Sequence, residues 1–339
     1  MTTLRYAKNI VTDTREYTPQ EMARIQEMMK KSPITSTVKL LRLLWMDNTK
    51  VKGASFYMEC IWLWEGKTTS GTTEEPHVHA FDEVIGFISS DPEHPKELGA
   101  RMEIILGDET HFLTKSCLVY VPAGMKHCPL TFREVNRPVF FFTLAPISRY
   151  GRTSERTGLP KTTDKKPPAF TPPPPDKNGS RYVRYIITEP APHRLSSPTD
   201  QPPPPPPKQT ARTTQIVSLN EDVSPGSFYV DFVWIWSGEM TMAPEPHSHT
   251  FDEMIGIVGY PADREKPRVV GGDVSIMLGD EKHVLKQSSL VFVPKGLSHC
   301  PIEFKNIKTP ALCFTIGNTP KWDRNQPRQN RTKSDGLRG

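Results

Sequence analysis

An eight-residue stretch occurs twice in this 339-residue chain and constrains its fold and chemistry more than any other feature. Residues 76–83 read Pro-His-Val-His-Ala-Phe-Asp-Glu, and residues 246–253 read Pro-His-Ser-His-Thr-Phe-Asp-Glu. Each copy holds two histidines one residue apart and a glutamate four residues after the second histidine. In an extended segment these three positions share one face, because side chains alternate along a strand. Two imidazoles and a carboxylate directed at one point predict a site for a divalent transition metal.

A second repeated motif supplies a fourth candidate ligand in each half. Residues 121–129 and 293–301 share the pattern Val-Pro-x-Gly-x-x-His-Cys-Pro, and each follows a β-rich run. The proline and glycine favour a type I turn, which would bring the histidine back over the sheet. Two sites of three histidines and one glutamate are therefore predicted. The predicted ligands are His77, His79, Glu83 and His127 in the first half and His247, His249, Glu253 and His299 in the second.

Together the two motifs resemble the paired motifs of the cupins, and their duplication resembles a bicupin. The resemblance covers about residues 50–147 and 222–317. It implies an all-β, RmlC-like fold of two tandem antiparallel jelly-roll barrels, with a metal in the mouth of each. The sequence departs from the family pattern at glycine positions and at one asparagine position. The glycine matched by Gly71 is Thr241 in the second half, Ser116 and Ser288 replace the glycine that opens the second motif, and Thr131 and Glu303 replace the asparagine that closes it. Every ligand position is retained.

The duplication begins before the barrels. Residues 5–13 and 181–189 repeat one another as short β-rich arms, and the sequence leaves open whether each arm pairs with its own barrel, the other barrel or another subunit. Thr18 and Glu21 form a capping box around Pro19, which predicts a helix over residues 19–31. We expect this helix to pack on the outside of a barrel.

Proline separates the two repeated units. Residues 151–210 contain 16 of the 35 prolines of the chain, and such stretches favour extended, solvated polyproline II structure. We read this region as a spacer, although tandem prolines can also dock on partner domains. The predicted order is an N-terminal cupin domain over 1–150 (arm 4–13, helix 19–31, barrel about 50–147), a Pro-rich linker over 151–180, a C-terminal cupin domain over 181–320 (arm 181–189, Pro-rich insert 190–210, barrel about 213–318) and a disordered basic tail over 321–339.

The net charge of +5 does not describe the barrels. Residues 149–212 hold twelve Lys and Arg against five Asp and Glu, and residues 321–339 hold six against two. The basic excess therefore lies in the linker and the tail, and the rest of the chain is acidic. This distribution argues against nucleic-acid binding by the barrels.

Cysteine usage and hydropathy predict a cytoplasmic protein without membrane association. The five cysteines are an odd number and lack Cys-x-x-Cys spacing, so neither a disulfide framework nor a zinc ribbon is expected. The first residues have no apolar signal core, and no stretch approaches the roughly 18 apolar residues that a membrane span needs. Exposed barrel edges would allow a homo-oligomer.

Several other repeated residues are candidates for roles near the sites. Parity places Glu75 and Glu245 toward the pocket, as carboxylates that support the ligands or act in acid–base catalysis. We expect the other repeated pairs to pack in the core or to serve as ordinary strand side chains. These pairs are Cys128 and Cys300, His111 and His283, Tyr57 and Tyr229, and Glu59 and Asp231.

The leading functional hypothesis is a metal-dependent enzyme that acts on a small organic acid, phenol or diketone by metal chelation. Bicupins with this ligand set resemble oxalate decarboxylases and several dioxygenases, so decarboxylase, lyase and dioxygenase chemistry all stay open. The cofactors would be up to two divalent ions of Mn, Fe, Ni, Co or Zn per chain. The alternative is a non-catalytic bicupin that binds a metal or a small ligand. A regulator is disfavoured, because no helix-turn-helix pattern is visible.

Overall fold

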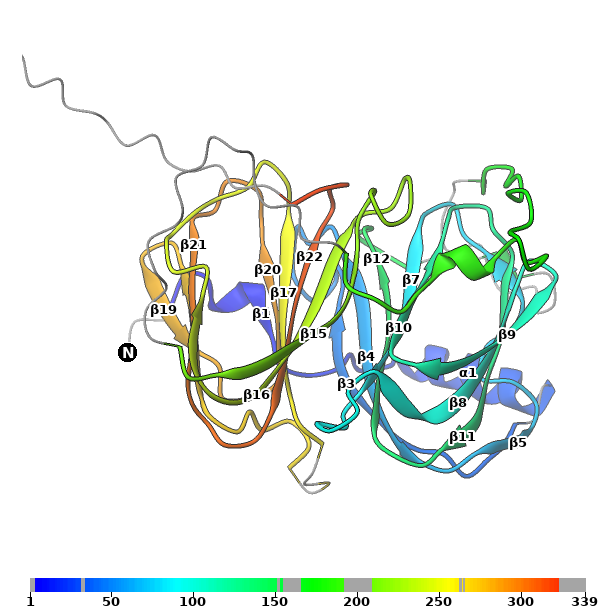
Figure 1. Ribbon diagram of the computed structural model, residues 1–339, viewed down its shortest axis with the longest axis horizontal. Helices are drawn as coiled ribbons and strands as arrows, with labels where there is room; N and C mark the ends of the chain where they lie inside the picture. Colours follow the sequence, from blue (N-terminus) through cyan, green and yellow to red (C-terminus); the bar gives the residue numbers. More distant parts are fainter. Residues whose placement is uncertain are drawn as a thin grey trace, which may run out of the picture.

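The computed structural model describes residues 4–31, 34–150, 153–154, 166–191, 209–261, 264 and 266–322. It shows two antiparallel β-barrels side by side, one from each half of the chain (Figure 1). The fold is all-β with jelly-roll barrels, as predicted. The described helical segments are too short or too polar to cross a bilayer.

Two facing sheets form the first barrel. One has the strand order β14-β10-β7-β12-β4-β3 and the other β13-β6-β11-β8-β9, and a small sheet pairs β2 with β5. Strand β3 precedes the barrel start near residue 50 that the motifs suggested. The strands are β2 (Thr35–Ser36), β3 (Lys39–Met46), β4 (Tyr57–Glu65), β5 (Thr68–Ser70), β6 (His77–Val78), β7 (Glu83–Ser89), β8 (Glu97–Leu106), β9 (Glu109–Lys115), β10 (Cys117–Val121), β11 (His127–Val135), β12 (Val139–Ala145), β13 (Thr153–Ser154) and β14 (Ile186–Ile187).

The second barrel repeats this plan in one continuous sheet. Its order is β1-β20-β17-β22-β16-β21-β18-β19, with β15 also paired to β16. The long strand β16 joins the two faces, because its first part pairs with β22 and its last part with β21. The strands are β1 (Ile10–Val11), β15 (Arg212–Leu219), β16 (Tyr229–Met242), β17 (Glu253–Gly259), β18 (Asp273–Leu278), β19 (Glu281–Val284), β20 (Ser289–Val293), β21 (His299–Ile307) and β22 (Ala311–Gly317).

The two arms are exchanged between the barrels. Each arm is a short 3₁₀ turn, η1 (Ala7–Asn9) or η2 (Val183–Tyr185), followed by a two-residue strand, so the longer strand expected at each arm does not form. Strand β1 pairs with β20 of the second barrel, and β14 pairs with β10 of the first barrel. Figure 1 shows this exchange: the blue N-terminal arm lies in the orange and yellow barrel. The arm assigned to the N-terminal domain therefore completes the C-terminal barrel, and the converse holds for the second arm.

The largest hydrophobic core lies between the barrels. It joins outward-facing residues of β4, β7, β10 and β12 to their counterparts in the second half, while separate cores fill each barrel. Phe142 stacks on Phe232 with ring centroids 4.9 Å apart, and Phe232 stacks on Phe314 at 4.7 Å. The indole N–H of Trp234 donates a buried hydrogen bond of 2.8 Å to the carbonyl of Ser89. The two barrels thus share one apolar interface.

The predicted helix is present as α1 (Pro19–Lys31). Its capping box is complete, because the Glu21 amide donates to Thr18 Oγ1 at 3.2 Å and the Thr18 amide donates to Glu21 Oε2 at 2.9 Å.

The described part of the linker packs on protein instead of standing as a free spacer. Phe170 lies against the core of the first barrel beside Tyr182, and Arg184 donates a hydrogen bond to the carbonyl of Pro174. The proline run at 202–207, most of the insert at 190–210 and the tail from residue 323 lie outside the described residues.

Candidate metal centres

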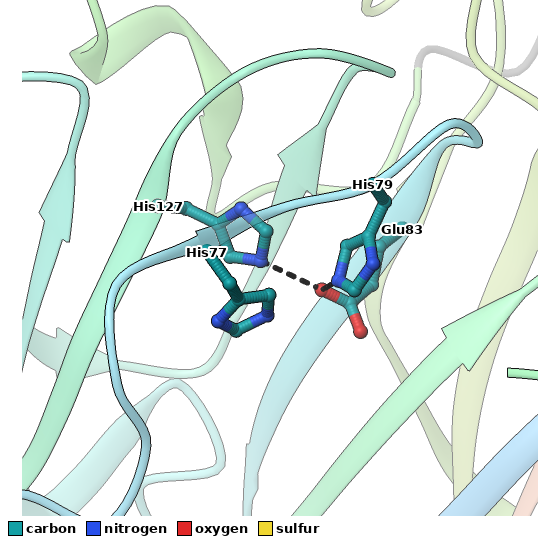
Figure 2. Close-up of side chains that lie close together, drawn as sticks. All are labelled: His77, His79, Glu83 and His127. Carbon is teal, nitrogen blue, oxygen red and sulfur yellow. Dashed lines mark ion pairs between the residues drawn. The ribbon is translucent and has the colours of Figure 1, made fainter. Parts of the chain in front are cut away.

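The predicted ligands of the first half meet inside the mouth of the first barrel (Figure 2). Strand β6 carries His77, the segment after it carries His79, and β7 and β11 begin at Glu83 and His127. Because β6 pairs with β11 and β7 belongs to the facing sheet, the four side chains converge across the barrel. One ligand atom from each residue lies within 4.8 Å of all the others, and none of the four residues is more than 2% exposed.

Backbone carbonyls fix which ring nitrogen faces the site. The Nδ1 atoms of His77 and His127 lie 2.6 Å from the carbonyl oxygen of Glu75 and 3.0 Å from that of Met125. A carbonyl can only accept, so each Nδ1 carries the hydrogen and each Nε2 presents a lone pair. Both Nε2 atoms, and Glu83 Oε1, are buried without a hydrogen-bond partner. Buried polar atoms of this kind are costly unless something binds them, and oriented imidazoles are typical of metal ligands.

The glutamate is the charged member of this group. Glu83 Oε2 lies 3.1 Å from His127 Nε2 and 3.4 Å from His79 Nε2. Burial alone would raise the pKa of Glu83, but His79 and His127 outweigh burial and hold that pKa well below its usual range. Burial, together with His127 and His79, lowers the pKa of His77 to about 2. Glu83 is therefore anionic and His77 neutral, which are the forms of these side chains that bind divalent metals.

The second barrel repeats the site with a looser glutamate. His247, His249 and His299 form a buried group whose nitrogens lie within 4.8 Å of one another, whereas Glu253 does not meet this limit for all three. Glu253 Oε2 still lies 2.9 Å from His299 Nε2 and 3.6 Å from His249 Nε2, so we count it as a ligand. Despite the burial of Glu253, its contacts with the same two histidines lower its pKa to about 2.

Orientation by carbonyls is also repeated in the second site. The Nδ1 atoms of His247 and His299 face the carbonyls of Glu245 and Leu297 at 3.1 and 3.0 Å. Both barrels therefore use the same backbone geometry to point imidazole nitrogens inward, and each half has a group that fits one divalent ion.

Two residues inside the repeated stretch hold the ligands in place and were missed by sequence reasoning. Asp82 Oδ1 accepts a 2.8 Å hydrogen bond from the Ala123 amide, and Asp252 Oδ1 accepts one of 2.8 Å from the Lys295 amide. Each aspartate thereby ties the first motif to the turn of the second. The phenylalanine before it stacks on the second histidine at 4.5 Å, as Phe81 on His79 and Phe251 on His249. The phenylalanine and the aspartate are the same in both copies of the stretch, and this repetition could have identified them from the sequence.

The other predicted candidates fall into different places. Glu75 and Glu245 contribute backbone carbonyls to the ligand histidines; the Glu75 side chain is half-buried and that of Glu245 is exposed. His111 and His283 lie outside both ligand groups, next to Glu109 and Glu281 at 3.5 and 3.4 Å. Cys128 and Cys300 are buried in the barrel cores, as expected.

The wall next to the first site is aromatic, and a partly exposed ion pair between Glu59 and Arg42 lies beside it. The Tyr57 ring lies 4.5 Å from that of Tyr150 and 5.0 Å from that of Trp45, and its hydroxyl is 3.3 Å from Thr143 Oγ1. Glu59 lies two residues after Tyr57 on the same face of β4, and its Oε1 atom is 3.3 Å from Arg42 Nε. Burial raises the pKa of Glu59 although Arg42 opposes the shift. In the second barrel a neutral amide takes the place of the arginine, and Gln215 Nε2 donates a 2.8 Å hydrogen bond to Asp231 Oδ1.

Two barrels, each with His-x-His-x-x-x-Glu and a distant histidine converging in its mouth, form the two-domain cupin architecture. The fold is that of a bicupin. Neither a protein-family model nor a curated protein sequence matches this chain.

Among solved structures, a variant of oxalate decarboxylase from Bacillus subtilis is 12% identical, with a TM-score of 0.47 over 87% of this chain and 77% of that chain. Oxalate decarboxylase of Lactobacillus farciminis, in a formate complex, is 13% identical, with a TM-score of 0.48 over 87% and 86%. Another structure of the Bacillus protein is described by its Mn(II) centres, and it aligns with a TM-score of 0.46 at 12% identity.

Proposed function

We propose that this chain is a metal-dependent bicupin enzyme that binds a small organic acid as a chelate and acts on it by decarboxylase, lyase or dioxygenase chemistry. Phenols and diketones, which also chelate through oxygen, are the further substrate classes. One observation carries this proposal. Backbone carbonyls orient the rings of His77 and His127, so that the lone pair of each Nε2 points into the buried barrel mouth beside the Glu83 carboxylate.

The charge of the first site favours an anionic substrate. A bound divalent ion would take its histidine ligands as neutral imidazoles, and Glu83 would supply the one negative charge, so the two positive charges of the ion would exceed the negative charge of the protein ligands. A bound ion would act there as a Lewis acid toward oxygen atoms of the substrate. The chain itself holds the ligands rigidly, and the rings of Phe81, Tyr57 and Tyr150 keep water from that side of the site.

Proton transfer is assigned to a carboxylate near the ligands. Glu75 is the better placed of the two predicted acid–base residues, because Glu245 is exposed to solvent. We expect Glu75→Gln to lower kcat and to leave metal content unchanged, whereas Glu245→Gln should change neither. Loss of metal in the Glu75 variant would assign it a structural role instead.

A binding role is the second candidate, and the second barrel favours it. There the indole N–H of Trp322 donates a 3.2 Å hydrogen bond to Glu253 Oε1, which satisfies a carboxylate oxygen within the protein. Because Trp322 occupies this carboxylate oxygen, the second site suits a structural metal or a small ligand that is bound without being converted.

Metal content is the deciding experiment. Protein purified without chelator or nickel affinity resin should contain about two equivalents of Mn, Fe, Co, Ni or Zn by elemental analysis, and should turn over members of a panel of organic acids, phenols and diketones. One equivalent would restrict the proposal to one barrel. No metal, with no gain on reconstitution, would reject the enzyme, and tight ligand binding without turnover would favour the binding role.

We also propose a cytoplasmic homo-oligomer. All five cysteines are free and buried, which suits a reducing compartment. Phe112 on β9 and Val284 on β19 are 50% and 60% exposed at equivalent positions on barrel-edge strands, and such edges are available for pairing. Light scattering coupled to size exclusion should show more than one chain per particle, and Phe112→Lys should reduce the mass.

A further inference from the structure

The two sites differ in the residue that covers them. Tyr150 lies five residues after the end of β12, and Trp322 lies five residues after the end of β22. These strands are equivalent, since β12 pairs with β4 in the same way that β22 pairs with β16. The duplication therefore placed one covering aromatic residue over each site, and the two residues have different chemistry.

Tyr150 brings a hydroxyl to the ligands of the first site. Its oxygen lies 3.1 Å from His79 Nε2, the nitrogen that also lies 3.4 Å from Glu83 Oε2. The ring packs 5.0 Å from His79, 5.8 Å from Phe81 and 4.5 Å from Tyr57. Three aromatic neighbours hold the ring, so the hydroxyl is fixed at the point where the ligand atoms meet.

Trp322 offers no such group in the second site. Its ring lies 5.9 Å from His247 and 5.3 Å from His249, and its N–H is directed to Glu253 Oε1. An indole N–H can only donate, and here it already donates to a ligand. In the first site the corresponding oxygen, Glu83 Oε1, has no hydrogen-bond partner and stays available to the site. The tyrosine thus faces the interior of its site, whereas the tryptophan holds a ligand.

We propose that Tyr150 is a substrate-contacting residue, whose hydroxyl donates a hydrogen bond to a substrate oxygen at the first ligand group, and that Trp322 leaves the second barrel without this contact. The first barrel is then the reactive one and the second holds its metal without turnover. The assignment of turnover to the first barrel rests on the proposed function, but the contact between Tyr150 and a bound substrate does not depend on turnover.

The test compares Tyr150→Phe with the matched variant Trp322→Phe in cobalt-substituted protein. Oxalate serves as a carboxylate probe, and its binding is followed by the visible absorption of the cobalt. Metal content is measured in parallel. We expect Tyr150→Phe to keep the metal of the wild type and to weaken oxalate binding by about 10-fold or more, as the loss of one hydrogen bond to a charged group predicts. Trp322→Phe should weaken metal binding in the second site, because it removes the hydrogen bond to Glu253, and should leave oxalate binding unchanged. Equal effects of the two variants, or no effect of Tyr150→Phe, would overturn the proposal.

A reciprocal pair guards against loss of folding in the phenylalanine variants. Trp322→Tyr should give the second site a spectral response to oxalate that the wild-type second site lacks, whereas Tyr150→Trp should abolish the response of the first site. Failure of Trp322→Tyr to alter the response of a folded, metal-loaded protein would contradict the assignment. Asymmetric binding without turnover of any substrate would reject the enzyme and leave the Tyr150 contact supported.

Discussion

Asp82 Oδ1 accepts a hydrogen bond from the backbone amide of Ala123 at 2.8 Å, and this bond joins the two sequence motifs that supply the first metal site. The Gly124 amide donates a second bond to the carbonyl of His79 at 2.8 Å, so the turn before His127 is fixed directly to the histidine segment. The second barrel repeats both bonds through Asp252 and Gly296. Ligand geometry therefore depends on residues that do not touch the metal position.

Asp82→Ala is expected to weaken metal binding in the first site by roughly 10- to 100-fold, the usual effect of removing a group that orients ligands. Titration with a competing chelator measures this affinity. Asp82→Asn keeps an acceptor oxygen and should recover most of it. Asp252→Ala should affect the second site alone, and an equal loss from both sites in either variant would contradict the local role.

Gly86→Ala is expected to destabilise the protein by about 1–3 kcal/mol through overpacking. A Cβ at this position on β7 would lie 2.0 Å from the Phe142 ring, which fills the interface between the barrels. Urea unfolding gives the change in free energy. The double variant Gly86→Ala with Phe142→Leu should be more stable than the sum of the single changes predicts, because the smaller side chain relieves the clash.

Asn9→Ala tests the exchanged arm. Asn9 is 7% exposed and its side-chain amide donates a 2.9 Å hydrogen bond to the carbonyl of Phe292 in the second barrel. Loss of a partner for a buried carbonyl should lower the free energy of unfolding by about 1–3 kcal/mol. The exposed neighbour Lys8 provides the control, since Lys8→Ala should be neutral. Similar unfolding curves for both variants would show that the arm contributes little.

Glu303 predicts a specific dependence of stability on pH. Hydrogen bonds from Lys282 and Lys305, at 2.6 and 3.1 Å, lower the pKa of Glu303 to about 2. Because the folded pKa lies below the unfolded value, its stabilisation is complete above about pH 4.5 and is lost as the pH falls toward 2. Solvent screens this surface group, so the contribution is roughly 0.5–1 kcal/mol. Glu303→Gln should remove that much at pH 7 and almost nothing at pH 2.5, as measured by urea unfolding at both values.

The side chains that converge in each barrel mouth could be predicted from the sequence, because short motifs with fixed spacing act largely through local geometry. The turn before residue 127 places His127 locally. Residues 77 and 83 do not share the single extended strand that the parity argument assumed, because a bend at residues 80–81 separates β6 from β7 and these strands belong to facing sheets. The helix over residues 19–31 followed from its capping box, which also acts locally. The prediction of two barrels came from the resemblance of the repeated motifs to those of the cupins.

Only the tertiary structure decided which barrel each arm completes and how the two sites differ. Strands β1 and β14 are each two residues long, so their pairing depends on the edges that β20 and β10 present, and these edges lie far away in the sequence. Tyr150 and Trp322 follow the last strand of each barrel, and no local pattern directs them to the ligands. Their contacts exist because closure of each barrel brings the end of its last strand over the mouth, where the chemistry of one side chain distinguishes two otherwise repeated sites.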